Sequence, residues 1–330
     1  MSLTIIKPGL LDTIQDLGRY GYSHWGINPG GAMDRYASQV ANILVGNKVD
    51  QALIEIHFPG PQILINQNAL IAITGADFSP MLNEQVLALW QPMVVRKNTL
   101  LQFPKLKSGS VCYIGVHGGF CIDQWLGSRS TNLKAGAGGF LGRQLKKGDE
   151  LYFKENTVYF AGLLKQEHNL ELLPWRASTK RIYEYPHEIF IMKGREWEYL
   201  TGTSQYDFIE NNFIIHPTSD RMGYQLGGIR LHMNDKFEMV SSGVHSGTIQ
   251  LLPDGQLIVL MADHQTTGGY PRIGHVISSH LPKLAQLRPS ESVKFRIVDI
   301  SVAEELLQAQ QKELHILEMA CHEHLNAIVC

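Results

Sequence analysis

Four short polar segments, each flanked by glycine, carry the kinds of side chain that enzymes use for chemistry. They combine acidic, basic, hydroxyl and amide residues, and they are 15–34, 118–131, 219–224 and 262–271. An arginine offers a planar fork of donors that suits a carboxylate or a phosphate. Glycine beside serine or threonine exposes backbone N–H groups that can hold an anion or a developing oxyanion. Any one segment could instead tie a turn together by local hydrogen bonds, but four in one chain favour a functional site.

Several common motifs are absent from the sequence. No Gly-Lys dipeptide occurs, which excludes a Walker A phosphate loop. The run Gly136–Gly142 lacks the spacing of a dinucleotide-binding loop, and 243–247 lacks that of an esterase nucleophile elbow. No Met-Lys-Met sequence is present, so we expect no covalent biotin on this chain. No His-Glu-x-x-His or Cys-x-x-Cys pair indicates a metal site.

Short apolar runs bounded by turn residues dominate the chain and predict strands. The clearest are 62–66, 69–74, 110–116, 188–192, 257–262 and 293–298. Only three segments have a helical period, namely 33–45, 280–287 and 300–327. Many strands with few helices predict a mainly β fold built from barrels or sandwiches rather than a doubly wound sheet.

The strand pattern lapses between residues 162 and 184, where we expect a domain boundary. The predicted organisation is a β subdomain over 1–165, a linker over 166–185, a second β subdomain over 186–300, and a C-terminal helix and tail over 301–330. The length of 330 residues agrees with one large or two medium domains.

Composition and charge exclude several classes of partner. The 29 basic and 31 acidic residues give a net charge of -2 without any Lys/Arg block, so we expect no nucleic-acid partner. No apolar run approaches the roughly 20 residues that span a bilayer, so we expect no membrane partner. Four scattered cysteines do not form a disulfide framework, which predicts a cytoplasmic protein with reduced thiols.

The polar segments, in this order, resemble the allophanate hydrolase subunit 2 family, also known as the 5-oxoprolinase C-subunit family or the biotin-dependent carboxyltransferase family. The resemblance runs from about residue 4 to 298. The phrases that carry it include Gln15-Asp-Leu-Gly-Arg19, Gly31-Ala-Met-Asp34, Gly127-Ser-Arg-Ser-Thr131, Ser219-Asp-Arg-Met-Gly-Tyr224, Gly247-Thr-Ile-Gln250 and Gln265-Thr-Thr-Gly-Gly-Tyr-Pro271. The resemblance implies two cyclophilin-like β-barrel subdomains.

The resemblance implies three alternative functions. The first is the C subunit of an ATP-dependent 5-oxoprolinase, which opens 5-oxo-L-proline to L-glutamate together with the A subunit of that enzyme and a relative of its B subunit. The second is a biotin-dependent carboxyltransferase acting on urea or another amide. The third is a regulatory binding protein that antagonises a kinase inhibitor related to the B subunit. The absence of a biotinyl motif favours the first, with ATP and Mg²⁺ bound by this chain or together with a partner.

Residue chemistry placed on the family phrases predicts the site residues. We expect Arg221 and Arg129 to clamp anions and Asp220 to act as an acid/base or orienting group. The expected substrate-binding groups share a polar or glycine-rich setting, and they are Gln265, Thr266, Thr267, Gly268, Gly269, Tyr270, Ser128, Asp16 and Arg19. Asp16 and Arg19 belong either to this site or to an ion pair that joins the barrels.

Overall fold

The computed structural model describes residues 1–154, 168–185, 187–235 and 239–329. The chain forms two compact units that are not continuous in sequence. The first comprises Met1–Arg19, Asp34–Ser178 and Lys312–Cys330, and the second comprises Tyr20–Met33 and Thr179–Gln311. The passage after Ser178 falls inside the expected linker, but the assignment of 20–33 to the second unit and of 312–330 to the first departs from the expected linear ranges.

The first unit contains two antiparallel six-stranded sheets. One has the order β11 (Glu150–Tyr152), β1 (Ser2–Lys7), β4 (Gln62–Ile65), β9 (Thr99–Gln102), β6 (Met81–Leu82) and β7 (Gln85–Val86). The other has the order β12 (Leu170–Leu172), β8 (Pro92–Val95), β5 (Ala69–Asp77), β10 (Ser108–Val116), β3 (Leu53–His57) and β2 (Leu11–Gln15).

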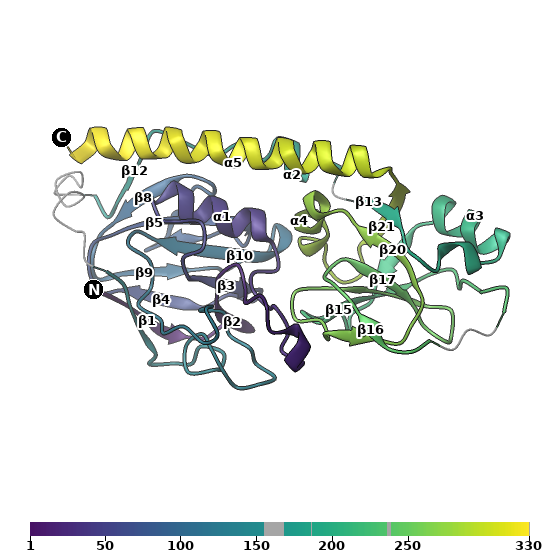
Figure 1. Cartoon of the computed structure of the whole chain (residues 1–330). Helices are drawn as coiled ribbons and strands as arrows, with labels where there is room; N and C mark the ends of the chain where they lie inside the picture. Colours follow the sequence, from purple (N-terminus) through teal and green to yellow (C-terminus); the bar gives the residue numbers. More distant parts are fainter. Residues whose placement is uncertain (155–167, 186, 236–238, 330) are drawn as a thin grey trace. The chain divides into compact units, whose positions relative to one another are not determined.

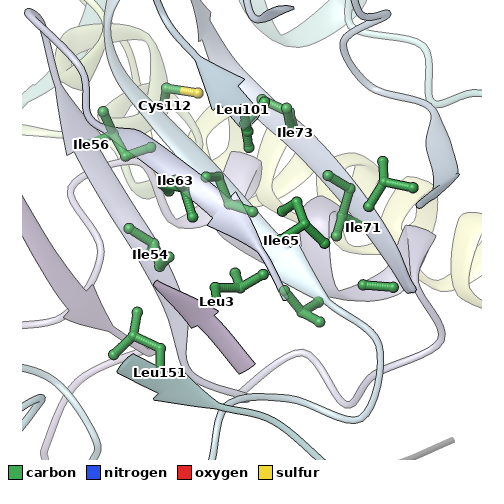
Figure 2. Packing of buried hydrophobic residues seen from close by; sticks show 14 of the residues in the cluster. Leu3, Ile54, Ile56, Ile63, Ile65, Ile71, Ile73, Leu101, Cys112 and Leu151 are labelled. Carbon is green, nitrogen blue, oxygen red and sulfur yellow. The ribbon is translucent and has the colours of Figure 1, made fainter. Parts of the chain in front are cut away.

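The hydrophobic core of the first unit is built from the alternate residues of both sheets (Figure 2). Leu3 from β1 and Ile63 from β4 meet Ile54 and Ile56 from β3, and all four are fully buried. Strand alternation places Glu55, between the two isoleucines of β3, on the opposite face of its sheet. That opposite face therefore carries buried polar groups, while the core face is apolar.

Helix α1 (Arg35–Leu44) packs against β5 and β10 and confirms the helix expected over 33–45 (Figure 1). The side chain of Asp34 caps the helix by accepting a hydrogen bond from the backbone N–H of Ala37 at 2.9 Å. The hydroxyl of Thr74 on β5 donates to the carbonyl of Ala37 at 2.7 Å. The start of α1 is therefore fixed to the sheet by specific polar contacts.

The second unit is built around a closed barrel, in agreement with the barrel fold expected for it. Its strand order is β13 (Glu188–Lys193), β20 (Arg272–Val276), β17 (Thr248–Leu251), β18 (Leu257–Leu260), β15 (Gly223–Gly227), β14 (Phe213–Ile215) and β21 (Ser292–Ile297). The pairing of β13 with β21 is parallel, and it closes the barrel. Phe208, Phe213 and Phe295 pack ring to ring, with centroids 5.1 to 5.8 Å apart.

A separate ribbon of two short strands, β16 (Ser242–Gly243) and β19 (Thr267–Gly268), belongs to the second unit. The other elements are η1 (Ser23–Trp25), α2 (Lys180–Tyr183), η3 (Trp197–Tyr199), α3 (Gly202–Glu210), η4 (Ser278–His280), α4 (Leu281–Ala285) and α5 (Ile300–Val329). Helices α4 and α5 confirm the expectations for 280–287 and 300–327. In the described part of the chain, no helix is long and apolar enough to cross a membrane.

Helix α3 was not expected from the sequence. Only Ser204 and Phe208 of its nine residues are buried, so it carries no continuous apolar stripe. Its start is fixed by a cap, because the Thr201 side chain accepts from the backbone N–H of Ser204 at 3.1 Å.

Candidate functional site

In the first unit, Asp16 lies at the end of β2 with four uncharged hydrogen-bond donors around it. Its Oδ1 accepts from the hydroxyls of Ser128 at 2.7 Å and Ser130 at 2.5 Å, and from the backbone N–H of Gly18 at 2.7 Å. Its Oδ2 accepts from the backbone N–H of Arg129 at 2.5 Å. Asp16 is only 6% exposed, so its carboxylate is stabilised by these four hydrogen bonds rather than by water. We call these residues the Asp16 cluster.

The guanidinium of Arg129 is bound to the protein through its Nε. Its Nε donates to the carbonyl oxygen of Ile122 at 3.1 Å, while its backbone N–H is bound to Asp16. The part of the chain that the structure describes supplies no hydrogen-bond partner for Nη1 or Nη2. The side chain is partly exposed, so this pair of nitrogens can take both oxygens of a carboxylate or a phosphate.

Arg19 is fully enclosed next to the Asp16 cluster. It is 2% exposed, its Nη2 donates to the carbonyl oxygen of Ser130, and its guanidinium carbon lies 4.7 Å from the ring centroid of Trp125. A glycine-rich turn covers it: a Cβ at Gly138 would overlap the Ser130 carbonyl oxygen, and one at Gly139 would overlap Thr131 Oγ1. Arg19 is therefore placed to shape the cluster rather than to meet solvent.

A second polar network of the first unit was missed by the sequence analysis. Glu55 is fully buried, and its Oε2 accepts from the hydroxyl of Tyr113 at 2.8 Å. The same hydroxyl accepts from the backbone N–H of Asp34 at 2.7 Å, and His57 Nε2 lies 3.5 Å from Glu55 Oε1. Burial first, and then Glu55 and Asp34, raise the pKa of Tyr113 well above its usual value, so it remains a neutral donor. The signal in the sequence is a glutamate between two isoleucines of one strand.

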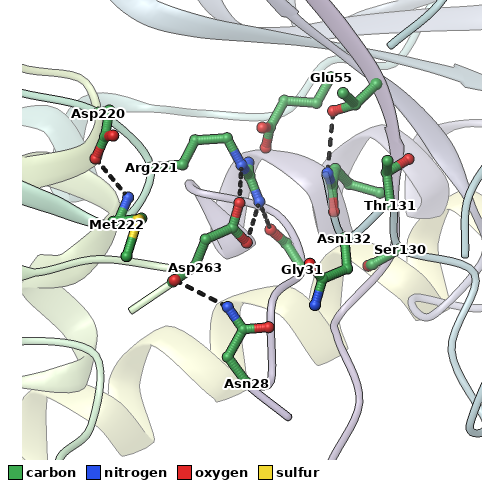
Figure 3. A network of polar contacts seen from close by, with 12 residues as sticks. Asn28, Gly31, Glu55, Ser130, Thr131, Asn132, Asp220, Arg221, Met222 and Asp263 are labelled. Carbon is green, nitrogen blue, oxygen red and sulfur yellow. Dashed lines mark hydrogen bonds and ion pairs between the residues drawn. The ribbon is translucent and has the colours of Figure 1, made fainter. Parts of the chain in front are cut away.

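In the second unit, Arg221 is paired with Asp263 (Figure 3). Arg221 Nε donates to Asp263 Oδ2 at 2.8 Å, and Nη2 donates to Oδ1 at 3.0 Å and to the carbonyl oxygen of Gly31 at 2.7 Å. Asn28 Nδ2 donates to the carbonyl oxygen of Asp263 at 2.8 Å. The side chains of Arg221 and Asp263 are 6% and 17% exposed, so the pair is largely desolvated. These contacts fix residues 28–31 against the loop that carries Asp263.

Asp220, next to Arg221 in the chain, stabilises a local turn. Its Oδ1 accepts from the backbone N–H of Met222 at 2.8 Å and of Gly223 at 3.2 Å, and the residue is exposed. Such a bond pattern is typical of an aspartate that stabilises a turn. The acid/base role expected for Asp220 stays a prediction.

The glycine-rich segment after Asp263 forms one strand of the ribbon. Thr267 and Gly268 pair with Gly243 and Ser242, and the carbonyl oxygen of Thr266 accepts from Val244 N. The remaining expected residues of this segment differ in exposure: Gln265 and Gly269 are partly buried, and Tyr270 is 43% exposed.

The structure thus brings the expected residues together in two groups, one within each unit. The first-unit group is Asp16, Arg19, Ser128 and Arg129. In the second unit, Arg221 binds Asp263, which precedes the 265–270 segment in the chain, and Asp220 lies next to Arg221. Their substrate and catalytic roles stay predictions. Asp263, Glu55 and Gln250 were not expected as site residues from the sequence, although Asp263 lies within the fourth polar segment and Gln250 within a family phrase. Among the described residues, no group of three or more His, Cys, Asp or Glu could hold a metal ion.

Comparisons with known proteins agree with this architecture. Residues 25–297 match the family model described as the carboxyltransferase domain, subdomain A and B. The chain is 37% identical to the C subunit of the 5-oxoprolinase of Haemophilus influenzae over 89% of this chain and 90% of that protein. It is 31% identical to the C subunit of the 5-oxoprolinase of Escherichia coli over 98% of this chain and 99% of that protein.

Larger proteins contain a similar region. The urea amidolyase of Saccharomyces cerevisiae is 27% identical over 99% of this chain, but the match spans 18% of that protein. The crystal structure of the K. lactis urea amidolyase superposes with a TM-score of 0.86 at 25% identity, covering 96% of this chain and 20% of that one. The fold, the matched range and the full-length relatives agree: the chain belongs to the carboxyltransferase domain, subdomain A and B, family.

Proposed function

We propose that this chain is the C subunit of an ATP-dependent 5-oxoprolinase. The observation that carries the proposal is the extent of the match to the two bacterial relatives. The alignments span 90% and 99% of proteins that are named as the C subunit of 5-oxoprolinase. By contrast, the match to the yeast urea amidolyase spans only 18% of that protein. The relatives that share most of their length with this chain therefore support the 5-oxoprolinase reaction.

In the proposed reaction, ATP phosphorylates the lactam carbonyl oxygen of 5-oxoproline and leaves as ADP. One water then adds to the activated carbon and the ring C–N bond breaks, which leaves an acyl phosphate, and a second water cleaves it to glutamate and phosphate. The lactam is a stable amide, so phosphorylation of its oxygen must first make the carbonyl carbon electrophilic enough for water to attack. The site must hold a small carboxylate and must neutralise phosphate charge. ATP and Mg²⁺ belong to the reaction, and a partner subunit would help to bind them.

Arg129 is the residue of the Asp16 cluster that suits an anionic group. Its Nε and its backbone N–H are fixed by Ile122 and Asp16, and its two Nη nitrogens have no protein partner among the described residues. A guanidinium held in this way loses little conformational freedom when it binds two oxygens. We assign Arg129 to the carboxylate or the phosphate, and Asp16 to the positioning of Arg129.

Arg221 has a different role in this proposal. A guanidinium that already binds both oxygens of Asp263 has its charge balanced within the unit. We therefore assign Arg221 and Asp263 to the positioning of residues 28–31 and 265–269. If an anion also binds Arg221, it does so in addition to Asp263.

Carboxyl transfer from carboxybiotin to an amide is the second candidate, because the fold matches urea carboxylase. The crystal structure of the Kluyveromyces lactis urea carboxylase superposes with a TM-score of 0.84 over 96% of this chain. A carboxyltransferase requires biotin on another protein, whereas the 5-oxoprolinase reaction does not.

The experiment is reconstitution of the chain with the A and B subunits of a 5-oxoprolinase. Glutamate release from 5-oxoproline and ATP is measured for the full mixture and for mixtures that lack one component. The proposal predicts glutamate only when this chain is present, without added biotin. A stable complex that releases no glutamate would contradict it. Urea- or amide-dependent consumption of carboxybiotin would then support the second candidate, and a complex with neither activity would support a regulatory role.

A further inference from the structure

A buried amide of the second unit has one end without a hydrogen-bond partner. Gln250 lies on β17 and has no exposed surface. Its Oε1 accepts from Gln265 Nε2 at 3.4 Å, but its Nε2 is buried and has no partner among the described residues. Buried polar groups are nearly always paired, because an unmade hydrogen bond costs folding free energy. The unpaired amide N–H at this position can therefore donate to an atom of a ligand.

The ribbon of β16 and β19 lies over this amide. Gly268 of β19 approaches Gln250 so closely that a Cβ at position 268 would overlap Nε2. The ribbon consists of two residue pairs and forms a sheet of its own, apart from the barrel strand that carries Gln250. A two-stranded ribbon this short is marginally stable, so it can lift at small cost.

The neighbouring Gln265 supplies the complementary group. Its Nε2 is bound to Gln250, and its side chain is partly exposed. Within the described ranges, no residue donates a hydrogen bond to Gln265 Oε1. The two side-chain amides therefore offer one donor, Gln250 Nε2, and one acceptor, Gln265 Oε1.

The charge near this pair is balanced, which favours a neutral group over an anion. Arg272 on β20 is the cross-strand neighbour of Gln250, and its guanidinium is bound through two nitrogens to Glu196 at 2.9 and 3.0 Å. Its Nη1 donates to the hydroxyl of Ser242 in the ribbon at 2.9 Å. An anion would have to compete with Glu196 for this arginine, whereas a neutral amide would not.

We propose that Gln250 and Gln265 bind the amide edge of a small ligand beneath the ribbon. Gln250 Nε2 donates to the ligand carbonyl oxygen, and Gln265 Oε1 accepts from the ligand N–H. A lactam presents its N–H and C=O on the same edge, and urea presents the same two groups. The identification of the ligand as the lactam of 5-oxoproline rests on the proposed function, whereas the amide site itself does not.

The test measures ligand binding and kinetics separately. Binding of 2-pyrrolidinone, a lactam without a carboxylate, is followed by ligand-observed NMR on the full chain and on the reconstituted complex. L-proline, which has no carbonyl group in its ring and therefore no lactam, is the negative probe. The variant Gln250→Met keeps the side-chain length and removes only the amide. We expect it to weaken 2-pyrrolidinone binding about tenfold or more, and to raise the KM for 5-oxoproline similarly with a smaller change in kcat.

Two matched pairs of variants distinguish loss of the binding site from a general loss of structure. Gln256→Met makes the same change at a glutamine whose backbone N–H, which the substitution keeps, donates to Asp254. This variant should bind 2-pyrrolidinone as the wild type does. Gly268→Ala should weaken binding because its Cβ overlaps the Gln250 amide, whereas Gly243→Ala in the same ribbon meets nothing within 4 Å and should not. Melting temperatures of all four variants show whether each one folds.

Each result bears on the site without depending on the reaction. Wild-type protein that fails to bind 2-pyrrolidinone, or a folded Gln250→Met variant with unchanged binding and KM, would overturn the amide site even if the complex releases glutamate. Binding that depends on Gln250 in a complex that releases no glutamate would support the amide site and contradict the proposed reaction.

Discussion

The two units bind a largely desolvated carboxylate in different ways. Asp16 of the first unit is bound by hydroxyl and backbone N–H groups, and no guanidinium donates to it within the described part of the chain. Asp263 of the second unit is bound by the guanidinium of Arg221. Neutral donors solvate a carboxylate but leave its charge in place, whereas an ion pair cancels it. The first arrangement leaves the Nη nitrogens of Arg129 for a ligand, and the second uses its arginine to position two loops.

The largest effect is expected from removal of Asp16. Asp16→Ala leaves the hydroxyls of Ser128 and Ser130 and the backbone N–H of Arg129 without their acceptor. Each buried unpaired group costs about 1–3 kcal/mol, so we expect the free energy of unfolding to fall by about 3–5 kcal/mol. Urea denaturation measures it. The control Asp123→Ala removes an exposed carboxylate of the same unit and should change stability by less than about 0.5 kcal/mol. Equal effects of the two variants would contradict the account.

The glycine-rich turn that covers Arg19 gives the next largest effect. Gly139→Ala places a methyl group into Thr131 Oγ1 at a φ of +55°, and we expect a loss of about 2–4 kcal/mol. Gly136→Ala has a similar φ of +62° but meets nothing within 4 Å, so it should cost only about 1 kcal/mol of backbone strain. Thermal unfolding of both variants separates packing from strain. A Gly136→Ala variant as unstable as Gly139→Ala would show that strain alone explains the effect.

The Arg221–Asp263 pair should behave as a unit. Arg221→Met and Asp263→Leu each leave one partner without its counter-ion, and each should cost about 2–4 kcal/mol, less than for a fully buried pair because Asp263 is 17% exposed. The double variant should lose less than the sum of the two, with a coupling of about 1–3 kcal/mol in a double-mutant cycle. Strict additivity would mean that the ion pair contributes no coupling.

Asp12 of β2 is a third carboxylate, and it extends the comparison to the pH dependence of stability. Among the described residues, its one hydrogen-bond donor is the backbone N–H of Gly9 at 2.5 Å, and its Oδ1 is buried without a partner. Burial raises the pKa of Asp12 from 3.8 to about 7, against the opposing effect of the Gly9 bond.

The folded protein therefore holds the Asp12 proton more tightly than the unfolded chain. Between about pH 4 and 7 the unfolded state binds fewer protons, so this group lowers stability as pH rises, by up to about 1.4 kcal/mol per pH unit. Asp12→Asn should remove this contribution and should flatten the pH dependence of the urea midpoint. An unchanged slope would show that Asp12 is ionised in the folded protein throughout this range.

The strands and the long helices were predictable because their patterns are local. The short apolar run of 110–116 and the helical period of 33–45 follow directly from which residues are buried. Helix α3 was not predictable, because its start depends on the Thr201 cap and it buries only two side chains. The assignment of 20–33 to the second unit depends on contacts of Asn28 and Gly31 with residues more than 180 positions away, for which the sequence has no local signal.

The candidate site was predictable in its segments but not in its pairings. The family phrases selected Asp16, Ser128 and Arg129, which the structure brings into one cluster. They did not show that Asp263 would bind Arg221, or that Asp220 would stabilise a turn, because residue type alone does not specify a partner. Gln250 was not expected as a site residue because a single buried glutamine is common among the apolar residues of a core strand.

The most direct test of the central comparison is the kinetics of Arg129→Gln in the reconstituted complex, with Arg176→Gln, an exposed arginine of the same unit, as its control. The account predicts that Arg129→Gln lowers kcat/KM for 5-oxoproline and ATP by about 10- to 100-fold, with a melting temperature unchanged within error. Kinetics equal to those of Arg176→Gln would contradict the assignment of Arg129 to an anionic ligand group.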